Sequence, residues 1–466
     1  MKIVNIKGSN DMKKVIHQTV IYFMLVSFLA VVLGKVFFGS DNQGLFFLYI
    51  YGVIVTTLLM MVFFMVFTSY RDPYEVAMEA KKNAKGKKDT EEEPVFVSCM
   101  VAAWNEGEGI AHCIESMINQ TYKHREIIFI NDCSDDNTGE IIDKYADKGL
   151  IKAIHLKKNV GKKKALGEGM RVAKGELFAF SDSDSSWKED AIEKMVAIFE
   201  HDPDIGATSG HCRVQNENRN LIVNVQDSWY EGQYGIRKAF ESIFGAVTCV
   251  SGPLAVFRKE AIYNYIPAWE EDTFLGQEFK FATDRTLTGF VLGSKYIGKK
   301  LKEKYADSDF VTSVDYPEKE WKIVYSRSAR SWTIVPDTFD RVFKQQVRWK
   351  KSFIRNTFFT GKFYWHKPFL PAIVYYFHIV FVVIGPFIVF RHLIYIPLHG
   401  NWSSIPLYLS GIVMTGFMFG LAYKLENKDC HIWIYRPLMS LFSTLVLSWL
   451  IFYSTVTIKK MIWSRA

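Results

Sequence analysis

Long apolar stretches occupy both ends of the chain. Two lie near the start, at about residues 18–38 and 45–67, and three lie near the end, at about 369–396, 404–423 and 433–458. Each holds the roughly twenty residues that a helix needs to cross a bilayer core. The first stretch is longer than a signal-peptide core and the second follows almost at once, so we interpret them as an uncleaved pair of membrane helices.

Basic residues flank this first pair. They are Lys2, Lys7, Lys13 and Lys14 before it and Arg71, Lys81, Lys82, Lys85, Lys87 and Lys88 after it. The short connection around 40–44 has neither Lys nor Arg. Because basic flanks stay on the cytoplasmic side, both flanks and the region that follows are predicted to be cytoplasmic.

The number of crossings near the C-terminus stays open. Three full crossings would place that end outside, whereas Lys459, Lys460 and Arg465 favour the inside. Pro437 lies near the start of the last stretch, so a broken or re-entrant segment is an alternative to a clean span.

The region between these apolar stretches alternates between two patterns. A polar linker rich in Lys and Glu is predicted at 79–93. The predicted strands that follow are 94–102, 126–130, 151–156 and 177–180, and the predicted helices are 109–119, 138–145 and 164–173. Buried strands that alternate with helices favour an α/β fold with a parallel, doubly wound sheet.

Polar clusters directly follow three of the predicted strands. They lie at 104–106, 131–136 and 181–185. In doubly wound sheets ligands bind beyond the carboxyl ends of the strands. We therefore expect these clusters to mark a binding site.

The composition narrows the class of protein. Apolar residues make up 49% of the 466 residues and charged ones 23%, which excludes a disordered chain, a fibrous repeat and a small disulfide scaffold. The net charge of 57 − 49 = +8 comes largely from membrane flanks and linkers, so a nucleic-acid partner is not favoured. The six cysteines form no CxxC pair, which fits a reduced cytoplasmic domain.

Asp182 and Asp184 are the first candidates for chemistry. Alternate residues of an extended chain point to the same side, so both carboxylates are able to share one cation. Two carboxylates suit Mg²⁺ or Mn²⁺ that keeps some waters and binds a diphosphate. The alternative is a helix cap before the predicted helix 187–199.

Two further polar residues are candidates for nucleotide binding. Asp132 is placed to accept a hydrogen bond from a base N–H, and its alternative is a turn residue. Lys162 is placed to reach a phosphate at a helix start. Lys163 and Lys164 are interpreted instead as a solvated basic loop. The sequence has no P-loop and no strand-linked GxGxxG motif.

Asp284 lies between apolar flanks and is a candidate general base, and its alternative is a surface pair with Arg285. Farther along, residues 341–359 alternate apolar and basic side chains, which predicts an amphipathic helix on the membrane surface. That segment carries Gln345, Arg348 and Trp349.

In this order the motifs resemble those of the membrane-embedded, processive family 2 glycosyltransferases, which include hyaluronan, chitin and cellulose synthases. The motifs are Ala103-Trp104-Asn105-Glu106, Asn131-Asp132-Cys133-Ser134, Gly161-Lys162, Asp182-Ser183-Asp184, Thr283-Asp284 and Gln345…Arg348-Trp349. The resemblance covers most of the chain, and the last motif is specific to processive members.

Within that family the chain is most similar to bacterial hyaluronan synthases and rhizobial chitooligosaccharide synthases. The likeness rests on Thr208-Ser209-Gly210-His211, Val250-Ser251-Gly252-Pro253-Leu254, Phe274-Leu275-Gly276, Asp284-Arg285-Thr286-Leu287-Thr288, the stretch 345–353 and the tail motif Trp463-Ser464-Arg465. The chain departs from the pattern of these synthases in three ways. It has different residues at Trp104, Asn131, Cys249, Val250, Ala282 and Thr283. It also has a stretch at 294–322 that resembles an insertion, and its tail motif is one residue shorter. Several of these changes fall where the acceptor is expected, so the identity of the polymer stays open.

The resemblance implies an α/β, cytoplasmic GT-A (Rossmann-like) glycosyltransferase domain inserted between N- and C-terminal transmembrane helices. The implied boundaries are 1–70 for an N-terminal helix pair, 71–94 for a charged linker, 95–335 for the GT-A domain, 336–366 for amphipathic interface helices and 367–466 for a C-terminal transmembrane region with a cytoplasmic tail.

The resemblance also implies roles for individual residues. Asp284 would be the catalytic base, and Asp184 would bind the cofactor Mn²⁺ or Mg²⁺. The UDP-sugar donor would be bound by Trp104, Glu106, Asp132, Lys162, Asp182, Gln345, Arg348, Trp463 and Arg465. The acceptor would be bound by Ser251, Gly252, Pro253 and Trp349.

The implied function is an inverting, processive transferase that polymerises UDP-sugars and moves the polysaccharide across the plasma membrane. The catalytic domain and both termini would be cytoplasmic, and the lipid bilayer and the growing polysaccharide would be partners. A hyaluronan-type polymer from UDP-GlcNAc and UDP-GlcA leads, and a chitin-like or other β-linked polysaccharide is the alternative. The oligomeric state stays open.

Two other classes of protein are alternatives that the sequence favours less. A non-processive transferase with a lipid acceptor would not need the Gln345…Arg348-Trp349 motif. A transporter with a regulatory domain would need a relay of ionisable residues in the membrane, whereas the apolar segments hold few, mainly His378, Arg391 and His392.

Overall fold

The computed structural model describes residues 46–84, 93–107, 109–426 and 430–460, and these fall into two compact units. The helical unit takes its residues from Met1–Tyr70, Asn224–Ile243 and Ile373–Trp449. The sheet unit takes its residues from Arg71–Val223, Phe244–Ala372 and Leu450–Ala466. Each unit is therefore assembled from segments that lie far apart in the sequence.

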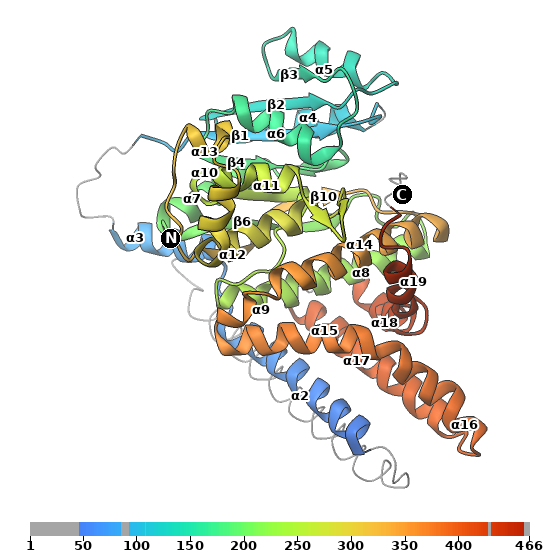
Figure 1. Cartoon of the computed structure of the whole chain (residues 1–466). Helices are drawn as coiled ribbons and strands as arrows, with labels where there is room; N and C mark the ends of the chain where they lie inside the picture. Colours follow the sequence, from blue (N-terminus) through green and yellow to red (C-terminus); the bar gives the residue numbers. More distant parts are fainter. Residues whose placement is uncertain (1–45, 85–92, 108, 427–429, 461–466) are drawn as a thin grey trace, which may run out of the picture. The chain divides into compact units, whose positions relative to one another are not determined.

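The sheet unit is built on an eight-stranded sheet with the order β3-β2-β1-β4-β7-β6-β10-β5 (Figure 1). The strands are β1 (Val97–Ala103), β2 (Arg125–Asn131), β3 (Lys152–His155), β4 (Leu177–Phe180), β5 (Ser185–Trp187), β6 (Ile205–Val214), β7 (Ala255–Arg258) and β10 (Lys322–Thr333). The first four in this order are parallel neighbours, as predicted. The other half is mixed, because β7 runs antiparallel to β4 and β6, and β5 runs antiparallel to β10.

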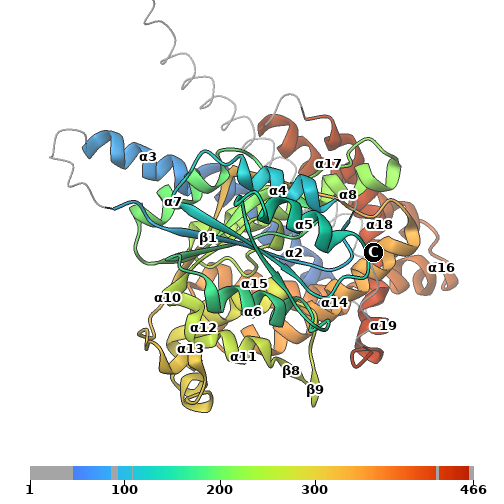
Figure 2. The same cartoon turned by 90° about the horizontal axis from the view of Figure 1, so that it is seen from above.

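Helices cover both faces of this sheet, so the α/β prediction is confirmed. Helices α4 (Ile110–Ile118) and α7 (Ala191–His201) lie on one face, and α6 (Lys162–Val172) and α12 (Thr283–Lys304) lie on the other (Figure 2). Helix α5 (Thr138–Ala146) connects β2 to β3. This layering leaves the carboxyl ends of β1, β2 and β4 at one edge, where their loops meet.

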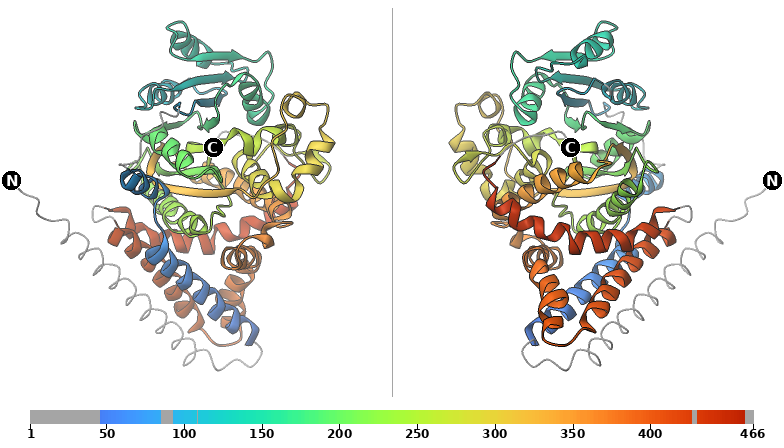
Figure 3. Two further views of the ribbon diagram at one scale, coloured as in Figure 1. Left: turned by 90° about the vertical axis from the view of Figure 1, so that its left-hand side faces the viewer. Right: turned by 90° about the vertical axis from the view of Figure 1, so that its right-hand side faces the viewer.

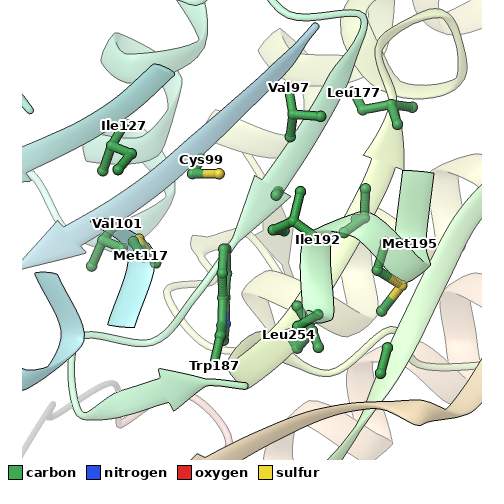
Figure 4. Packing of buried hydrophobic residues seen from close by; sticks show 14 of the residues in the cluster. Val97, Cys99, Val101, Met117, Ile127, Leu177, Trp187, Ile192, Met195 and Leu254 are labelled. Atoms are coloured by element: carbon green, nitrogen blue, oxygen red, sulfur yellow. The ribbon is translucent and has the colours of Figure 1, made fainter. Parts of the chain in front are cut away.

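The core of the sheet unit lies between the sheet and the helices α4 and α7. Figure 4 shows Val101, Met117, Ile192 and Leu254 around the ring of Trp187, which is 4% exposed. The ring nitrogen of Trp187 donates a hydrogen bond of 2.6 Å to the carbonyl oxygen of Pro253. Full burial of a large side chain contributes about 3 kcal/mol, so this packing fixes the loop before β7 against the end of β4.

Residues 73–84 form helix α3 (Pro73–Ala84), although a linker was expected to begin at residue 71. The helix packs on α7 and β10. Its anchor is the buried Asp72, which accepts hydrogen bonds from the hydroxyl of Ser326 at 2.9 Å and from the backbone N–H groups of Ser328 and Tyr74 at 2.8 and 2.9 Å. The Tyr74 bond caps the start of α3.

A short hairpin follows the helix α11 (Ile266–Glu270). It pairs β8 (Thr273–Phe274) with β9 (Gln277–Glu278) and projects from the body of the unit in Figure 2. Its two turn residues, Leu275 and Gly276, have φ of 51° and 79°. Positive φ at both positions is the requirement of the tight hairpin turn whose twist matches the strands.

The helical unit contains apolar helices and one segment from the middle of the chain. Its long helices are α2 (Phe46–Ser69), α15 (Phe369–Phe390) and α17 (Ser404–Glu426), and Figure 3 shows α2 beside α17. Phe63 and Phe419 join these two with ring centroids 4.6 Å apart. The inserted segment, residues 224–243, includes the π-helix Gly232–Lys238 and α9 (Ala239–Ile243), which pack on α2.

Four helices in the described part of the chain are long and apolar enough to cross a membrane. They are Val55–Asn83, Phe369–Leu398, Ser404–Leu425 and Ile432–Val456. These overlap four of the five stretches predicted from the sequence, although the first begins at Val55 rather than at residue 45 and continues into α3. The remaining stretch, at 18–38, lies outside the described residues.

The last apolar stretch is interrupted, as the alternative of a broken segment predicted, but the break lies at Val446 rather than at Pro437. Helix α18 (Arg436–Leu445) ends before a short 3-10 turn at Leu447–Trp449, and α19 (Leu450–Val456) follows. Helix α18 packs on α17 in the helical unit, where Gly416 allows close approach because a Cβ there would lie 2.4 Å from the Cα of Pro437. Helix α19 belongs to the sheet unit and packs on α14 (Phe339–Thr360).

Candidate active site

Two loops at the carboxyl ends of β1 and β2 are bonded to each other. The backbone N–H of Asn105 donates to the hydroxyl of Ser134 at 2.9 Å, and that of Glu106 donates to Thr138 Oγ1 at 2.7 Å. In return the N–H of Asp135 donates to Asn105 Oδ1 at 2.8 Å. Asn105 has a φ of 55°, a conformation that asparagine tolerates better than most residues. This double clamp holds Trp104, half-buried at the end of β1, and Glu106 in place.

Asp132 fixes the start of helix α6. Its buried carboxylate accepts hydrogen bonds from the backbone N–H groups of Val160 at 2.7 Å and Gly161 at 2.9 Å. Burial raises the pKa of Asp132, and the two N–H donors offset that rise only in part. Gly161 has a φ of 84°, which glycine adopts without strain, and it directly precedes Lys162. Asp132, directly after β2, therefore fixes the position at which helix α6 begins with Lys162.

Lys162 and Asp182 form an ion pair between the start of α6 and the end of β4. Both side chains are partly exposed, at 24% and 33%. Burial opposes the charge of the Lys162 ammonium, but the carboxylates of Asp182, Asp284 and Asp184 outweigh it and raise its pKa. The residues from three separate motifs are therefore close enough to act on one another electrostatically.

Asp184 is the most perturbed carboxylate of this group. Its Oδ1 accepts hydrogen bonds from the hydroxyls of Ser185 at 3.1 Å and Thr333 at 3.2 Å. Burial, followed by the like charges of Asp182 and Glu106, raises the pKa of Asp184 to about 6. The site thus carries more negative charge than Lys162 alone balances.

This charge distribution fits a hard divalent cation. Among the described residues, no group of three or more His, Cys, Asp or Glu side chains is arranged to hold a metal ion. Mg²⁺ and Mn²⁺ do not require such a cage, because they are often bound by one or two carboxylates together with water and phosphate oxygens. Asp184, with Asp182 beside it, offers that donor set.

The loop before β7 lies against the same carboxylates. A Cβ added to Gly252 would lie 2.7 Å from both carboxylate oxygens of Asp182, so only glycine fits there without a shift. The neighbouring Ser251 donates its backbone N–H to the hydroxyl of Ser209 at 3.4 Å, and the Pro253 carbonyl accepts from Trp187. Of the three predicted acceptor residues in this loop, Gly252 therefore lies against Asp182.

Asp284 lies in the first turn of α12, where the helix dipole favours a negative charge. Its Oδ1 accepts from the backbone N–H of Arg285 at 2.7 Å, and its Oδ2 is 3.6 Å from the Cys249 thiol. The chain enters this helix through Ala282, which has a φ of 63°. Such a left-handed conformation costs a non-glycine residue about 1 kcal/mol or more, so the backbone is strained directly before Asp284.

Helix α14 carries the remaining predicted residues that the structure describes. Gln345 is buried and its Oε1 has no hydrogen-bond partner in the described part of the chain, whereas Arg348 and Trp349 are half-buried. The helix spans Phe339–Thr360, close to the predicted 341–359. Trp463 and Arg465 lie outside the described residues.

The structure contradicts the prediction that Lys163 is a solvated loop residue. It is not solvated: its side chain is 6% exposed and its ammonium donates to Asp272 Oδ2 at 2.7 Å. Lys164 is 45% exposed and therefore solvated as predicted, but it lies in helix α6 rather than in a loop, and it pairs with Glu278 at 3.1 Å. The pattern of three consecutive lysines gave no signal for this difference, because the partner Asp272 is far away in the sequence. Thr333, whose hydroxyl donates to Asp184, was missed for the same reason.

Comparisons with known proteins identify the domain that carries these residues. Residues 98–266 match the model of the family described as Glycosyl transferase family 2. This range runs from β1 through the loop that contains Gly252 and includes the ends of β1, β2 and β4. It stops before Asp284 and α14.

Curated relatives match the chain over a longer range. A poly-beta-1,6-N-acetyl-D-glucosamine synthase from Staphylococcus aureus (strain COL) is 27% identical over 270 residues, which are 57% of this chain and 57% of the relative. The synthase of the same name from Staphylococcus epidermidis is 29% identical over 256 residues, 55% of this chain and 54% of the relative. The chain thus spans a little over half the length of the curated relatives it matches.

Among solved structures, a mannosyltransferase from Pyrobaculum calidifontis in complex with GDP-Man and Mn²⁺ is similar at 17% identity and a TM-score of 0.47, covering 84% of this chain and 98% of that chain.

The family match and the mixed sheet with helices on both faces together confirm the predicted GT-A class. Residues 98–266 of the chain are a glycosyl transferase family 2 domain.

Proposed function

We propose that this chain is a processive, inverting glycosyltransferase that polymerises UDP-activated N-acetylglucosamine into a β-linked polysaccharide at a membrane. One observation carries the proposal: Lys162, Asp182 and Asp184 meet at the strand ends of a family 2 domain, with Asp284 near enough to raise the pKa of Lys162. The names of the curated relatives support the sugar, and the apolar helices support the membrane.

The cationic side of the site suits a nucleoside diphosphate. Lys162 starts helix α6, where the helix dipole and its ammonium both favour an anion. Arg348 on α14 would add a second cation, and Trp104 and Asp132 would bind the base of the nucleotide. A divalent cation held by Asp184, with Asp182 beside it, would help to neutralise the charge that develops on the leaving diphosphate.

The anionic side of the site suits activation of an acceptor hydroxyl. Asp284 is a carboxylate in the first turn of α12, and a carboxylate held beside an acceptor hydroxyl is able to take its proton. The released hydroxyl oxygen would attack the anomeric carbon from the face opposite the diphosphate, which inverts the configuration. Ser251, Gly252, Pro253 and Trp349 would hold the acceptor sugar, Trp349 by offering it an aromatic face.

Repeated addition requires that the polymer stays bound while it grows. The Gln345…Arg348-Trp349 motif lies on the amphipathic helix α14, and the chain carries four helices able to span a membrane. We therefore propose a multi-pass protein of the plasma membrane that keeps its catalytic domain and both termini in the cytoplasm and moves the product outward. The basic flanks of the apolar stretches support this orientation.

The relatives favour a polymer of one sugar over the two-sugar, hyaluronan-type product. Both curated relatives are named as synthases of poly-beta-1,6-N-acetyl-D-glucosamine, a polymer of one sugar. The likeness to hyaluronan and chitooligosaccharide synthases rests on short motifs, several of which this chain alters where the acceptor is expected. The choice of donor therefore decides between the candidates.

The test supplies membranes that contain the protein with UDP-GlcNAc alone, UDP-GlcA alone, or both, in the presence of Mn²⁺ or Mg²⁺. We expect UDP release and polymer from UDP-GlcNAc alone, and a loss of about 10²–10⁴ in rate for Asp284→Asn, because general-base catalysis contributes that much. Asp147→Asn makes the same change at an exposed site and is expected to keep full activity. Polymer only from both donors would favour the hyaluronan-type product, and no UDP release from any UDP-sugar would reject the proposal.

A further inference from the structure

A buried ion triad lies within the sheet unit between α6 and α14. The carboxylate of Asp272 accepts from the Lys163 ammonium at 2.7 Å and forms a second ion pair with the guanidinium of Arg355. Lys163 also donates to the carbonyl oxygen of Phe279 at 2.8 Å. The three side chains are only 3–6% exposed.

Stability alone does not explain this triad. Removing a charge from water costs several kcal/mol, and well-packed apolar side chains of similar volume are often as stable as a buried ion pair or more so. Burial lowers the pKa of Lys163 to about 8 and also lowers the pKa of Arg355, and Asp272 only partly offsets both shifts. What a triad offers and an apolar cluster lacks is a fixed direction for each of its hydrogen bonds.

The two basic residues of the triad, Lys163 and Arg355, lie on helices that also carry a predicted nucleotide-binding residue. Lys163 directly follows Lys162 in the first turn of α6. Arg355 lies seven residues after Arg348 on α14, almost two helical turns, so both project from the same side of the helix about 10 Å apart along its axis. Asp272 lies at the base of the hairpin β8–β9, where the N–H of Phe279 donates to its carbonyl oxygen at 2.7 Å.

We propose that Lys163, Asp272 and Arg355 are positioning residues, which hold Lys162 and Arg348 at a fixed spacing for the two phosphates of the nucleotide. The inference rests on the proposed function, since it needs a nucleoside diphosphate at this site. None of the three residues touches the reacting atoms. They act by fixing α6 to α14 through Asp272, so that neither helix turns when the diphosphate leaves.

The test measures the affinity of the full-length protein for UDP with Mn²⁺ by calorimetry in detergent or nanodiscs. Asp272→Asn and Lys163→Met are expected to weaken UDP binding about 10- to 100-fold, because small misplacements of binding groups have effects of that size. Lys163→Arg keeps the charge and a donor for Asp272, so it is expected to retain most of the affinity. Asp272→Asn weakens both ion pairs of the triad, whereas Lys163→Met removes only the pair between Lys163 and Asp272.

Glu270→Gln is the matched control. Glu270 is two residues before Asp272 and pairs with Arg171 near the other end of α6 at 3.0 Å, without any link to α14 through that pair. We expect it to lower the midpoint of thermal unfolding while leaving UDP affinity unchanged. If Asp272→Asn does not fold, Lys163→Gln decides, because it leaves the pair of Asp272 with Arg355 intact.

Equal UDP affinity in wild type, Asp272→Asn and Lys163→Met would overturn the positioning role and leave the proposed function standing. Equal losses in Asp272→Asn and Glu270→Gln would also overturn it, because they would show a general loss of structure. Absence of UDP binding by the wild-type protein would instead reject the proposed function, and the positioning role with it.

Discussion

Gly252 shows how tightly a single residue limits the site. A methyl group at this position would come within 2.7 Å of the Asp182 carboxylate and would push it away from Lys162. We therefore expect Gly252→Ala to lower kcat/KM for UDP release by about 10²-fold while the midpoint of thermal unfolding changes little. Gly109→Ala is the control, because a methyl group there has nothing within 4 Å. A fully active Gly252→Ala variant would show that the position of Asp182 does not matter.

Asp184 makes cation binding depend on pH. Its pKa is raised to about 6, so without a cation the folded protein holds this proton more tightly than the unfolded chain does. The free energy of unfolding should therefore fall as the pH rises through about 4 to 6, unless a cation replaces the proton. Below about pH 6 the affinity for Mn²⁺ should drop by up to ten-fold per pH unit.

Electron paramagnetic resonance of free Mn²⁺ in the presence of UDP measures this affinity at several pH values. Asp184→Asn removes the titrating group, so its residual Mn²⁺ affinity should vary much less with pH. A pH-independent affinity in the wild type would show that Asp184 is not a ligand of the cation.

The residues that the sequence revealed differ in kind from those it did not. Asp182 and Asp184 follow an apolar run that ends abruptly, so their place at the end of a strand was predictable from the pattern alone. Lys163 and Asp272 pair across 109 residues, and no local pattern indicates such a partner. Ion pairs between residues far apart in the sequence can be identified only from the folded structure.

Helix α3 is an element whose position depends on one buried carboxylate. Asp72→Ala would remove the cap of the helix and leave the N–H of Ser328 without its acceptor. We expect a loss of about 3 kcal/mol in the free energy of unfolding and faster proteolysis within helix α3 itself. Glu79→Ala on the same helix removes only an exposed ion pair with Arg71 and should cost less than about 1 kcal/mol. Equal stability of the two variants would contradict this account.

At the scale of elements, prediction worked where the pattern was regular. Strand β4 (Leu177–Phe180) has the predicted bounds, and β1, β2, β3 and the helices between them differ by a few residues. Strands β6 and β10 were not assigned, because polar residues such as Thr208, Ser209 and Ser331 interrupt their apolar runs although all three are buried. Burial on both faces by tertiary packing, rather than local preference, makes these segments strands.

At the scale of the molecule, hydropathy located the apolar helices but not the division into units. The range 95–335 was expected to form one domain, yet residues 224–243 belong to the helical unit. This segment contains Glu231, Arg237 and Glu241, so its composition does not mark it as a partner of apolar helices. Polar contacts inside the unit explain its place, such as that of Arg237 with His378 on α15 at 3.0 Å.

The break between α18 and α19 has a consequence for how the chain is made. Ribosomes deliver the family 2 domain early, but the sheet unit includes α19, which is synthesised only after all the long apolar helices. Until then the face of α14 that receives α19 stays uncovered, for as long as translation of about 100 more residues lasts. Final assembly of the sheet unit must therefore wait until the long apolar helices have been synthesised, which sets a simple order of events: apolar helices first, a complete sheet unit second.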